Sequence, residues 1–331
     1  MGRSMRFRRA LLALFAIAAA FAQGGSAVAQ TFPTRPVTMV VPFTAGGGTD
    51  LLARLTGQWL ERRLGKPFII ENKPGAGTTL AAMAVVRATP DGHTLMQATS
   101  TTMAINVTMA KQLPYEPLRD LVPVALLTAN PFFLVVRPGS PVKSVADLIA
   151  LAKAKPGELN YGSAGPGSMH HLSSELLLSL TGTKMTHVPY KATPPAMTDL
   201  IAGHIQVLFS DSTTSIPLIQ QGKLRALAVS GSARAAALPD VPTVAEAGVA
   251  GFESAAWQMI VAPAKTPPGI VALLNNEVRA IFSDATVRQE LSSRGLEPLI
   301  TGSPDQLKEF VSAEIARWRP IVHQAGVAAS E

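Results

Sequence analysis

The chain has 331 residues, 47% of them hydrophobic, and no cysteine. It is therefore long enough for a large core and about two domains, but it has no disulfide, thiol nucleophile or cysteine metal site. Its 29 Lys and Arg residues against 22 Asp and Glu residues give a net charge of +7 at pH 7. Four of those arginines and no acid lie in the first 29 residues, so the rest carries only +3. It has no basic stripe interleaved with aromatic residues, which argues against nucleic acid as a partner.

The first 29 residues have the pattern of an export signal. Four arginines between Arg3 and Arg9 precede an apolar run over residues 10–22, and Ala27-Val28-Ala29 forms a small-x-small site. The run is too short to cross a bilayer as a helix, which takes about 20 residues, and no cysteine lies near the site to carry a lipid. We expect cleavage after Ala29 and a mature chain that resides in the periplasm without being inserted in the membrane.

The mature chain opens with strands, glycine loops and helices in alternation. Gly65 ends the first helical pattern, and a polar turn over Thr99–Thr102 follows the third strand. This alternation indicates an α/β fold with a parallel sheet and helices on both faces. Ligands bind such sheets outside the carboxyl ends of the strands. The expected elements are strands over Val37–Val41, Phe68–Ile70 and Thr94–Ala98, and helices over Thr49–Leu64 and Leu80–Ala88.

The same alternation restarts after Pro131. A passage rich in proline and glycine over Leu238–Ser254 separates this second block from a last strand and two long helices. The expected strands are Phe132–Val136, Leu159–Tyr161, Met185–Val188, Ile205–Phe209, Leu224–Val229 and Trp257–Ala262. The expected helices are Val145–Ala154, Pro195–Ile201, Ile216–Gln221, Ile270–Phe282 and Pro304–Trp318.

The closing helices need a sheet to cover, and the first block has few helices of its own. We therefore expect the C-terminal segment to return to the first block, with the chain crossing near Thr128–Pro131 and again near Ser254–Trp257. This predicts a discontinuous first domain of residues 30–129 and 255–331, a second domain of residues 130–254, and a hinged cleft between them.

The stretch "VPFTAGGGTDLLARL" places three glycines between a strand and a helix. It fails the dinucleotide-binding pattern because Leu51 stands at the third glycine position, and it fails the phosphate-loop pattern because Thr49-Asp50 replaces Lys-Ser/Thr. Glycines at a helix start still let a ligand approach backbone N–H groups, which bind carboxylate as readily as phosphate. Two further loops, at Gly75–Thr78 and Gly165–Ser168, have the same position after a strand. Together the three loops predict an anion site.

The sequence lacks the residue patterns of a metal site or of a serine hydrolase. His170 and His171 with Glu175 lack the further ligands of a metal site, so His171 is expected to pack or cap near its loop. Ser163 does not lie in a Gly-x-Ser-x-Gly turn. Asp50 most simply stabilises the dipole of its helix, with binding of a ligand amine as the alternative. We expect no catalytic residue, no metal and no cofactor.

Several longer stretches carry a family resemblance: "FPTRPVTMVVPFTAGGGTDLLAR", "ENKPGAGTT", "DGHTLM", "YGSAGPGSMHHL", "VPYKATPPAMTDLIAGHIQV" and "GKLRALAVSGSARAAALPDVPTVAEAGVAGFE". They cover most of the mature chain. The sequence resembles the Bug family, the TctC-like extracytoplasmic solute-binding proteins of tripartite tricarboxylate transport systems. The resemblance implies a two-domain periplasmic binding protein of type II that closes like a flytrap on a small organic carboxylate.

The resemblance also implies how the ligand is held. One carboxylate is bound by main-chain amides and ordered waters at the first two loops, and the loop of the second domain completes the site. The expected partners are a small carboxylate and membrane transporter subunits, and the chain is expected to be a monomer. The candidate ligand residues are Phe43, Thr44, Ala45, Gly46, Gly47, Gly48, Asp50, Ala76, Gly77, Thr78, Ser100, Ser163, Gly165, Gly167, Ser168, His171 and Asp211.

Three positions depart from the family pattern. Ala192 follows Lys191 where glycine is usual, Gln206 stands where aspartate is common, and the run Ser210–Ser215 differs from the usual one. The distal end of the ligand is therefore unassigned, and Lys191 is expected to be a solvated or capping lysine. Two alternative functions stay open from the sequence: an exported hydrolase that uses Ser163 or Ser168 with His171, and a ligand sensor for a signalling system.

Overall fold

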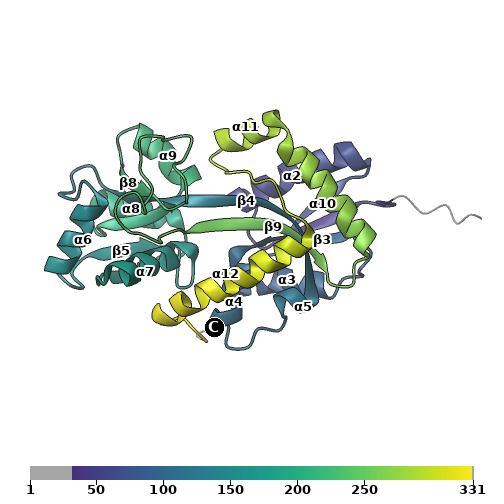
Figure 1. Cartoon of the computed structure of the whole chain (residues 1–331), viewed down its shortest axis with the longest axis horizontal. Coiled ribbons are helices and arrows are strands. Elements are labelled where there is room, and N and C mark those ends of the chain that lie inside the picture. Colours follow the sequence, from purple (N-terminus) through teal and green to yellow (C-terminus); the bar gives the residue numbers. More distant parts are fainter. Residues whose placement is uncertain (1–31, 330–331) are drawn as a thin grey trace, which may run out of the picture. The chain divides into compact units, whose positions relative to one another are not determined.

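The computed structural model describes residues 32–329. The chain divides into two compact units, Met1–Thr34 and Arg35–Glu331. Of the first unit only residues 32–34 are described, so the expected signal segment and its cleavage after Ala29 lie outside the described residues. The second unit holds the strands and helices given below (Figure 1). Within residues 32–329, no helix is both long and apolar enough to cross a bilayer.

The first half of the second unit alternates strands and helices as expected. In chain order its elements are β1 Val37–Val41, α2 Gly48–Leu64, β2 Phe68–Asn72, the 3-10 turn η1 Ala76–Thr78, α3 Thr79–Val86, β3 Thr94–Thr99, the π-helix η2 Thr101–Ile105, α4 Asn106–Met109, α5 Pro117–Asp120 and β4 Leu121–Val136.

The second half continues the alternation and closes with three helices. Its elements are α6 Val145–Ala154, β5 Asn160–Ser163, α7 Met169–Thr181, β6 Thr186–Pro189, α8 Thr193–Ala202, β7 Val207–Asp211, α9 Ser212–Gln220, β8 Arg225–Val229, β9 Ala255–Pro263, α10 Pro268–Ser283, α11 Ala285–Ser293 and α12 Pro304–Gln324. Neither α5 nor α11 was expected from the sequence.

Local chemistry explains where several helices begin and end. Gly65 ends α2 in a left-handed conformation with φ of 73°, which glycine adopts at little cost. Ser303 and Gln306 form a reciprocal capping box at the start of α12. Asp284 caps α11 by accepting hydrogen bonds from two backbone N–H groups, and Ser168 caps α7 by accepting one from the His171 N–H.

The sheet is mixed, which corrects the expectation of a parallel sheet. Its strand order is β2-β1-β3-β9-β4-β7-β5-β6, with β8 also paired to β4. The pairs within β2-β1-β3 and within β7-β5-β6 are parallel, whereas β9 is antiparallel to β3 and β4, and β4 is antiparallel to β7 and β8. The antiparallel pairs arise because β4 runs through both halves of the sheet and β9 returns beside it (Figure 1).

The segments expected to be connections between domains are strands paired with each other. Thr128 pairs with Gln258, and Pro131 pairs with Ala255. The first half of β4 was not expected, because Pro123 and Pro131 interrupt the apolar pattern there. Pro123 lies at a register shift in the pairing of β4 with β9. The division into residues 30–129 with 255–331 and residues 130–254 stays a prediction.

The buried side chains gather in clusters on either side of these two long strands. One cluster joins β1, β3 and β9 to α3 and α12, with Met96, Trp257 and Val311 among its members. A second joins β4, β5 and β7 to α6 and α7, and a third joins β4 and β7 to α8. Trp318 and Val322 at the end of α12 belong to the second cluster, so α12 contributes to both the first and the second cluster.

Candidate functional site

The predicted loops follow two sets of strand ends that face each other along β4. Thr99 at the end of β3 pairs with Gln258 of β9, which pairs with Thr128 of β4. Asp211 at the end of β7 pairs with Phe132 of β4. The two sets of ends are therefore four residues apart along β4, or about 13 Å at the rise of an extended strand. The loops that follow the two sets of strand ends therefore begin on opposite sides of this stretch of β4.

The first loop exposes the start of α2. Residues 43–48 are all exposed, and 41% of Phe43 is accessible. Gly47 occupies the capping position before α2 but has no side chain, so it makes no capping hydrogen bond to the helix. The first N–H groups of a helix have no partner within it, so those at the start of α2 are available to an anion from outside. The loop residues Thr44, Ala45, Gly46 and Gly48 carry no charge of their own.

Asp50 holds this loop in place. Its carboxylate accepts hydrogen bonds from the Gly46 N–H at 2.9 Å, from Arg54 at 2.9 and 3.0 Å, and from Asn72 Nδ2 at 3.0 Å. Asn72 Nδ2 also donates to the carbonyl of Phe43 at 3.0 Å. The hydrogen bond from Arg54 lowers the pKa of Asp50 to about 2, even though burial opposes this. Asp50 is only 3% exposed, so its carboxylate anchors the loop from inside.

We expect Asp50→Asn to lower the free energy of unfolding by about 2 kcal/mol at pH 7, because a charged hydrogen bond contributes about that much. The pKa of Asp50 is lowered from 3.8 to about 2 in the folded state. Its contribution is thus complete above pH 4 and is lost as the pH falls toward 2. Urea unfolding curves of both proteins at pH 7 and pH 2.5 test this. A difference that grows in acid would contradict it.

The second loop has a strained backbone. Ala76, Gly77 and Thr78 are consecutive left-handed residues, with φ of 46°, 55° and 79°. Two of the three carry a side chain, which makes this conformation costly. Such strain persists only where surrounding contacts impose it, and it gathers at functional sites. The turn of Ala76 and Gly77 is exposed, whereas Thr78 is buried.

The π-helix η2 and the first residue of α4 supply the contacts that impose this backbone. Thr102 Oγ1 donates to Thr78 Oγ1 at 3.0 Å, and Asn106 Nδ2 donates to the carbonyl of Gly77 at 2.7 Å. Tyr115 in turn donates to the carbonyl of Thr102 at 2.7 Å. The polar turn expected over Thr99–Thr102 is therefore wrong, because the Thr102 hydroxyl bonds to the second loop and the chain continues as a helix. Ser100 lies at the start of this helix and is 1% exposed.

The third loop, Ala164–Ser168, is closed by its own serines. Ser163 Oγ accepts from the Gly165 N–H at 3.0 Å, and Ser168 Oγ donates to the Gly165 carbonyl at 2.7 Å. Gly165 and Gly167 have φ of 114° and 69°, which favour glycine. A Cβ at Gly167 would lie 1.9 Å from the sulfur of Met109 in α4. The third loop thus reaches the segment that holds the second loop.

A stack of three rings lies next to the third loop; we call Tyr161, His187 and His171 the imidazole column. The centroids of His171 and His187 are 3.9 Å apart with planes at 9°, and those of His187 and Tyr161 are 5.0 Å apart at 15°. His171 Nδ1 accepts from the Gly167 N–H at 3.2 Å. Tyr161 donates to Glu175, whose Oε1 lies 3.8 Å from His171 Nε2. His171 therefore acts through the loop backbone.

Burial controls the protonation of this column. It lowers the pKa of His171 to about 3, with a further contribution from His187, and it lowers the pKa of His187 to about 4. Burial also raises the pKa of the Glu175 carboxyl, although the hydrogen bond from Tyr161 opposes this. Both imidazoles are therefore neutral at pH 7.

Asp211 forms a separate polar cluster at the end of β7. Its Oδ2 lies 3.1 Å from His170 Nε2 and accepts from Thr193 Oγ1 at 2.8 Å. Burial works against ionisation, but the charge and hydrogen bond of His170 and the hydroxyl of Thr193 outweigh it and lower the pKa of Asp211. The Asp211 side chain is 38% exposed, so it is accessible at this set of strand ends.

The serine and histidine pairing expected for a hydrolase is not assembled. Ser163 Oγ contacts His187 Nε2 at 2.6 Å and is fully buried. Ser168 Oγ accepts from the backbone N–H of His171 at 3.3 Å and makes no hydrogen bond to its ring among residues 32–329. The described part of the chain also contains no group of three or more His, Asp or Glu residues placed to hold a metal.

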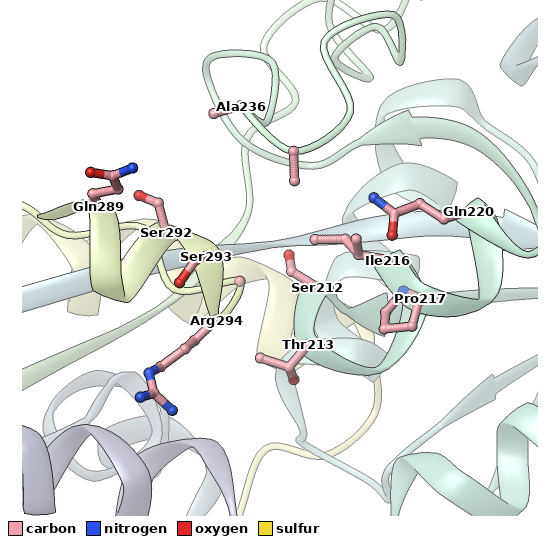
Figure 2. Close-up of a pocket in the computed structure, with 12 residues that line it drawn as sticks. Ser212, Thr213, Ile216, Pro217, Gln220, Ala236, Gln289, Ser292, Ser293 and Arg294 are labelled. Atoms are coloured by element: carbon pink, nitrogen blue, oxygen red, sulfur yellow. The ribbon is translucent and has the colours of Figure 1, made fainter.

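A separate open pocket of about 490 Å³ lies between α9 and the end of α11. Figure 2 shows Ser212, Thr213 and Ile216 on one side of it and Ser292 and Ser293 on the other. None of the candidate ligand residues lines this pocket, although Ser212 and Thr213 directly follow the candidate Asp211.

The sequence identified the loops but missed the residues that hold them. Arg54, Asn72, Thr102, Asn106 and His187 are all absent from the candidate ligand residues. Asn72 is the last residue of β2 and could have been found by its position at a strand end, and Arg54 by its spacing of four residues from Asp50 in α2. The others become neighbours of the loops only in the folded chain.

Comparison with known proteins gives a consistent result. The model of the family described as "Tripartite tricarboxylate transporter family receptor" matches residues 52–327. The chain is 36% identical over 299 residues to Protein BugT of Bordetella pertussis, covering 90% of this chain and 91% of that protein. It is also similar to the solved periplasmic binding protein BugD, at 32% identity and a TM-score of 0.76, covering 90% of this chain and 99% of that one.

Two further solved structures contain a bound ligand. Rpa4515 of R. palustris with adipate is 41% identical with a TM-score of 0.80, covering 90% of this chain and 99% of that one. MatC of Rhodopseudomonas palustris with bound malate is 38% identical with a TM-score of 0.75, covering 88% and 100%. The predicted family resemblance and the periplasmic-binding-protein fold class are confirmed.

Proposed function

Because the chain belongs to the tripartite tricarboxylate transporter receptor family, we propose that it is a periplasmic solute-binding protein that captures a small organic carboxylate. The observation that carries this proposal is the arrangement of the three loops. Two exposed, amide-rich turns follow the first set of strand ends, and a third turn follows the set that faces it about 13 Å away along β4. The similar proteins with adipate and with malate bound support a carboxylate as the ligand.

Neutral donors bind the carboxylate in this proposal. The ranges Phe43–Gly48 and Gly75–Thr78 contain no cationic side chain. The cations nearest to these two ranges in the sequence are already paired, since Arg54 binds Asp50 and Lys73 lies 2.6 Å from Glu71. The N–H groups at the start of α2 and in the strained turn of the second loop are therefore the donors for the anion.

We further propose the cellular context of the protein, which family membership and the sequence support. The mature chain begins after Ala29, resides in the periplasm as a monomer and delivers its ligand to membrane transporter subunits. It uses no cofactor and is not an enzyme, a view supported by the burial of Ser163 and by its contact with a histidine outside the expected pair. Its two predicted domains close on the ligand, so binding shifts the population from open to closed.

A thermal-shift screen of adipate, malate and other small carboxylates tests the proposal. A ligand at 100 times its Kd stabilises the folded protein by about 2.7 kcal/mol, which corresponds to roughly 5 °C in Tm for a chain of this size. We expect at least one carboxylate to give such a shift, with no turnover of the corresponding esters. Stabilisation by nucleotides alone, or repeated product release from esters, would contradict the proposal.

A further inference from the structure

In the third loop, the Gly167 amide is bonded to a single nitrogen of a histidine. The Gly167 N–H points to His171 Nδ1 at 3.2 Å, and both residues are buried. A neutral imidazole nitrogen without hydrogen accepts such a bond, but the same nitrogen becomes a donor when the ring is protonated. Two donors cannot share one bond, so the loop keeps this contact only while His171 is neutral.

His187 supports the same loop from the next strand. Its Nε2 lies 2.6 Å from Ser163 Oγ, which accepts from the Gly165 N–H at 3.0 Å. Its ring lies parallel to that of His171, with centroids 3.9 Å apart. Two positive charges at that distance repel strongly where water is scarce. The stacked arrangement therefore disfavours protonation of His171 whenever His187 is charged.

We propose that His171 and His187 are positioning residues that hold the third loop in its ligand-binding shape while His171 is neutral. This inference rests on the proposed function for its effect on ligand binding. It assigns no contact between either ring and the ligand, because His171 is 3% exposed and its Nδ1 faces the loop backbone. The rings act through Gly165 and Gly167.

The surroundings of the column agree with neutral rings. Tyr161 from β5 and Glu175 from α7 are the titratable groups that face it, and Tyr161 donates to Glu175. Burial raises the pKa of Glu175 and lowers that of both histidines. His170, the next residue of α7, bonds instead to Asp211 of β7.

The first experiment needs no ligand. Hydrogen exchange of the Gly167 amide is measured by NMR from pH 7 down to the onset of unfolding, together with the ring signals of His171. We expect a protected amide and a neutral His171 throughout the upper part of this range, with protection falling as His171 is protonated. In His187→Phe the stack of rings is retained without its charge and without the contact to Ser163, so protection should be lower at pH 7 and should fall at a higher pH than in the wild type. A freely exchanging Gly167 amide in the wild type, or an unshifted profile in His187→Phe, would overturn the proposal.

The second experiment compares variants of His171 by titration with adipate at pH 7. His171→Leu removes the acceptor and should weaken binding roughly threefold to tenfold, the range expected for one buried hydrogen bond. His171→Asn offers its side-chain oxygen near the position of Nδ1 and should restore most of the affinity. Because asparagine does not titrate, residue 171 should then cause no loss of affinity as the pH falls. Equal affinities for the wild type and His171→Leu would overturn the proposal. If no carboxylate binds the wild type, the proposed function fails, and the Gly167 exchange profile still decides the role of the two histidines.

Discussion

Glu314→Leu is expected to lower the free energy of unfolding by about 3–5 kcal/mol, the largest effect on stability that we predict. Glu314 is 7% exposed, and its Oε2 accepts hydrogen bonds from Trp257 Nε1 at 2.7 Å and from Trp318 Nε1 at 3.0 Å. Leucine would leave both indole N–H groups buried without an acceptor. The two rings are 2% and 1% exposed, so water cannot replace the lost bonds.

Guanidinium unfolding of the wild type, Glu314→Leu and Glu314→Gln measures this effect. Glutamine keeps a side-chain oxygen of nearly the same shape, so its loss should be clearly smaller than that of leucine. A leucine variant within 1 kcal/mol of the wild type would show that the two indole bonds contribute little.

The largest effect on binding is expected from Gly47→Val. Gly47 has φ of −83° and ψ of 171°, which valine adopts readily, and a Cβ there would meet only the Thr44 carbonyl at 3.9 Å. The variant should therefore fold, with about 1 kcal/mol lost at the start of the helix. A side chain at this position lies where a capping oxygen would bind the first N–H groups, so the methyl groups of valine would cover the donors for the carboxylate.

We expect the Kd of Gly47→Val for its carboxylate to rise by about tenfold or more, measured by calorimetry at pH 7. Lys191→Ala is the matched control, since Lys191 is exposed and amides carry the anion in our proposal; its Kd should stay within about twofold. Normal affinity in Gly47→Val would remove the first loop from the site, and a large loss in Lys191→Ala would assign the anion to a side-chain charge.

The regular elements could be predicted because their signals are local. The helix over Val145–Ala154 has the predicted bounds, and Gly65 ends α2 as its position suggests. The first half of β4 could not be predicted, since two prolines interrupt it and its pairing partner lies more than 120 residues away in β9. The mixed sheet follows from that same long-range pair.

The candidate site divides in the same way. The three glycine loops were found because glycine is needed for their backbone conformations, as at Gly165 and Gly167. The residues that hold the loops were not found, because their contacts depend on the folded chain. Asn106 bonds to Gly77 across 29 residues of sequence, and His187 meets His171 only through the pairing of β5 with β6. Neither contact leaves a periodic or compositional trace in the sequence.

Because two tryptophans share the carboxyl group of Glu314, tryptophan fluorescence can report on the packing between two core clusters. Trp257 belongs to the core cluster around β3 and Trp318 to the cluster around α7, and both indoles bond to one oxygen. Trp59, the third tryptophan, packs against Phe282 with ring centroids 6.1 Å apart. Indole emission responds to the N–H hydrogen bond. A movement of one cluster relative to the other would therefore change the emission of Trp257 and Trp318 together, whereas Trp59 makes no bond to Glu314 and serves as the reference.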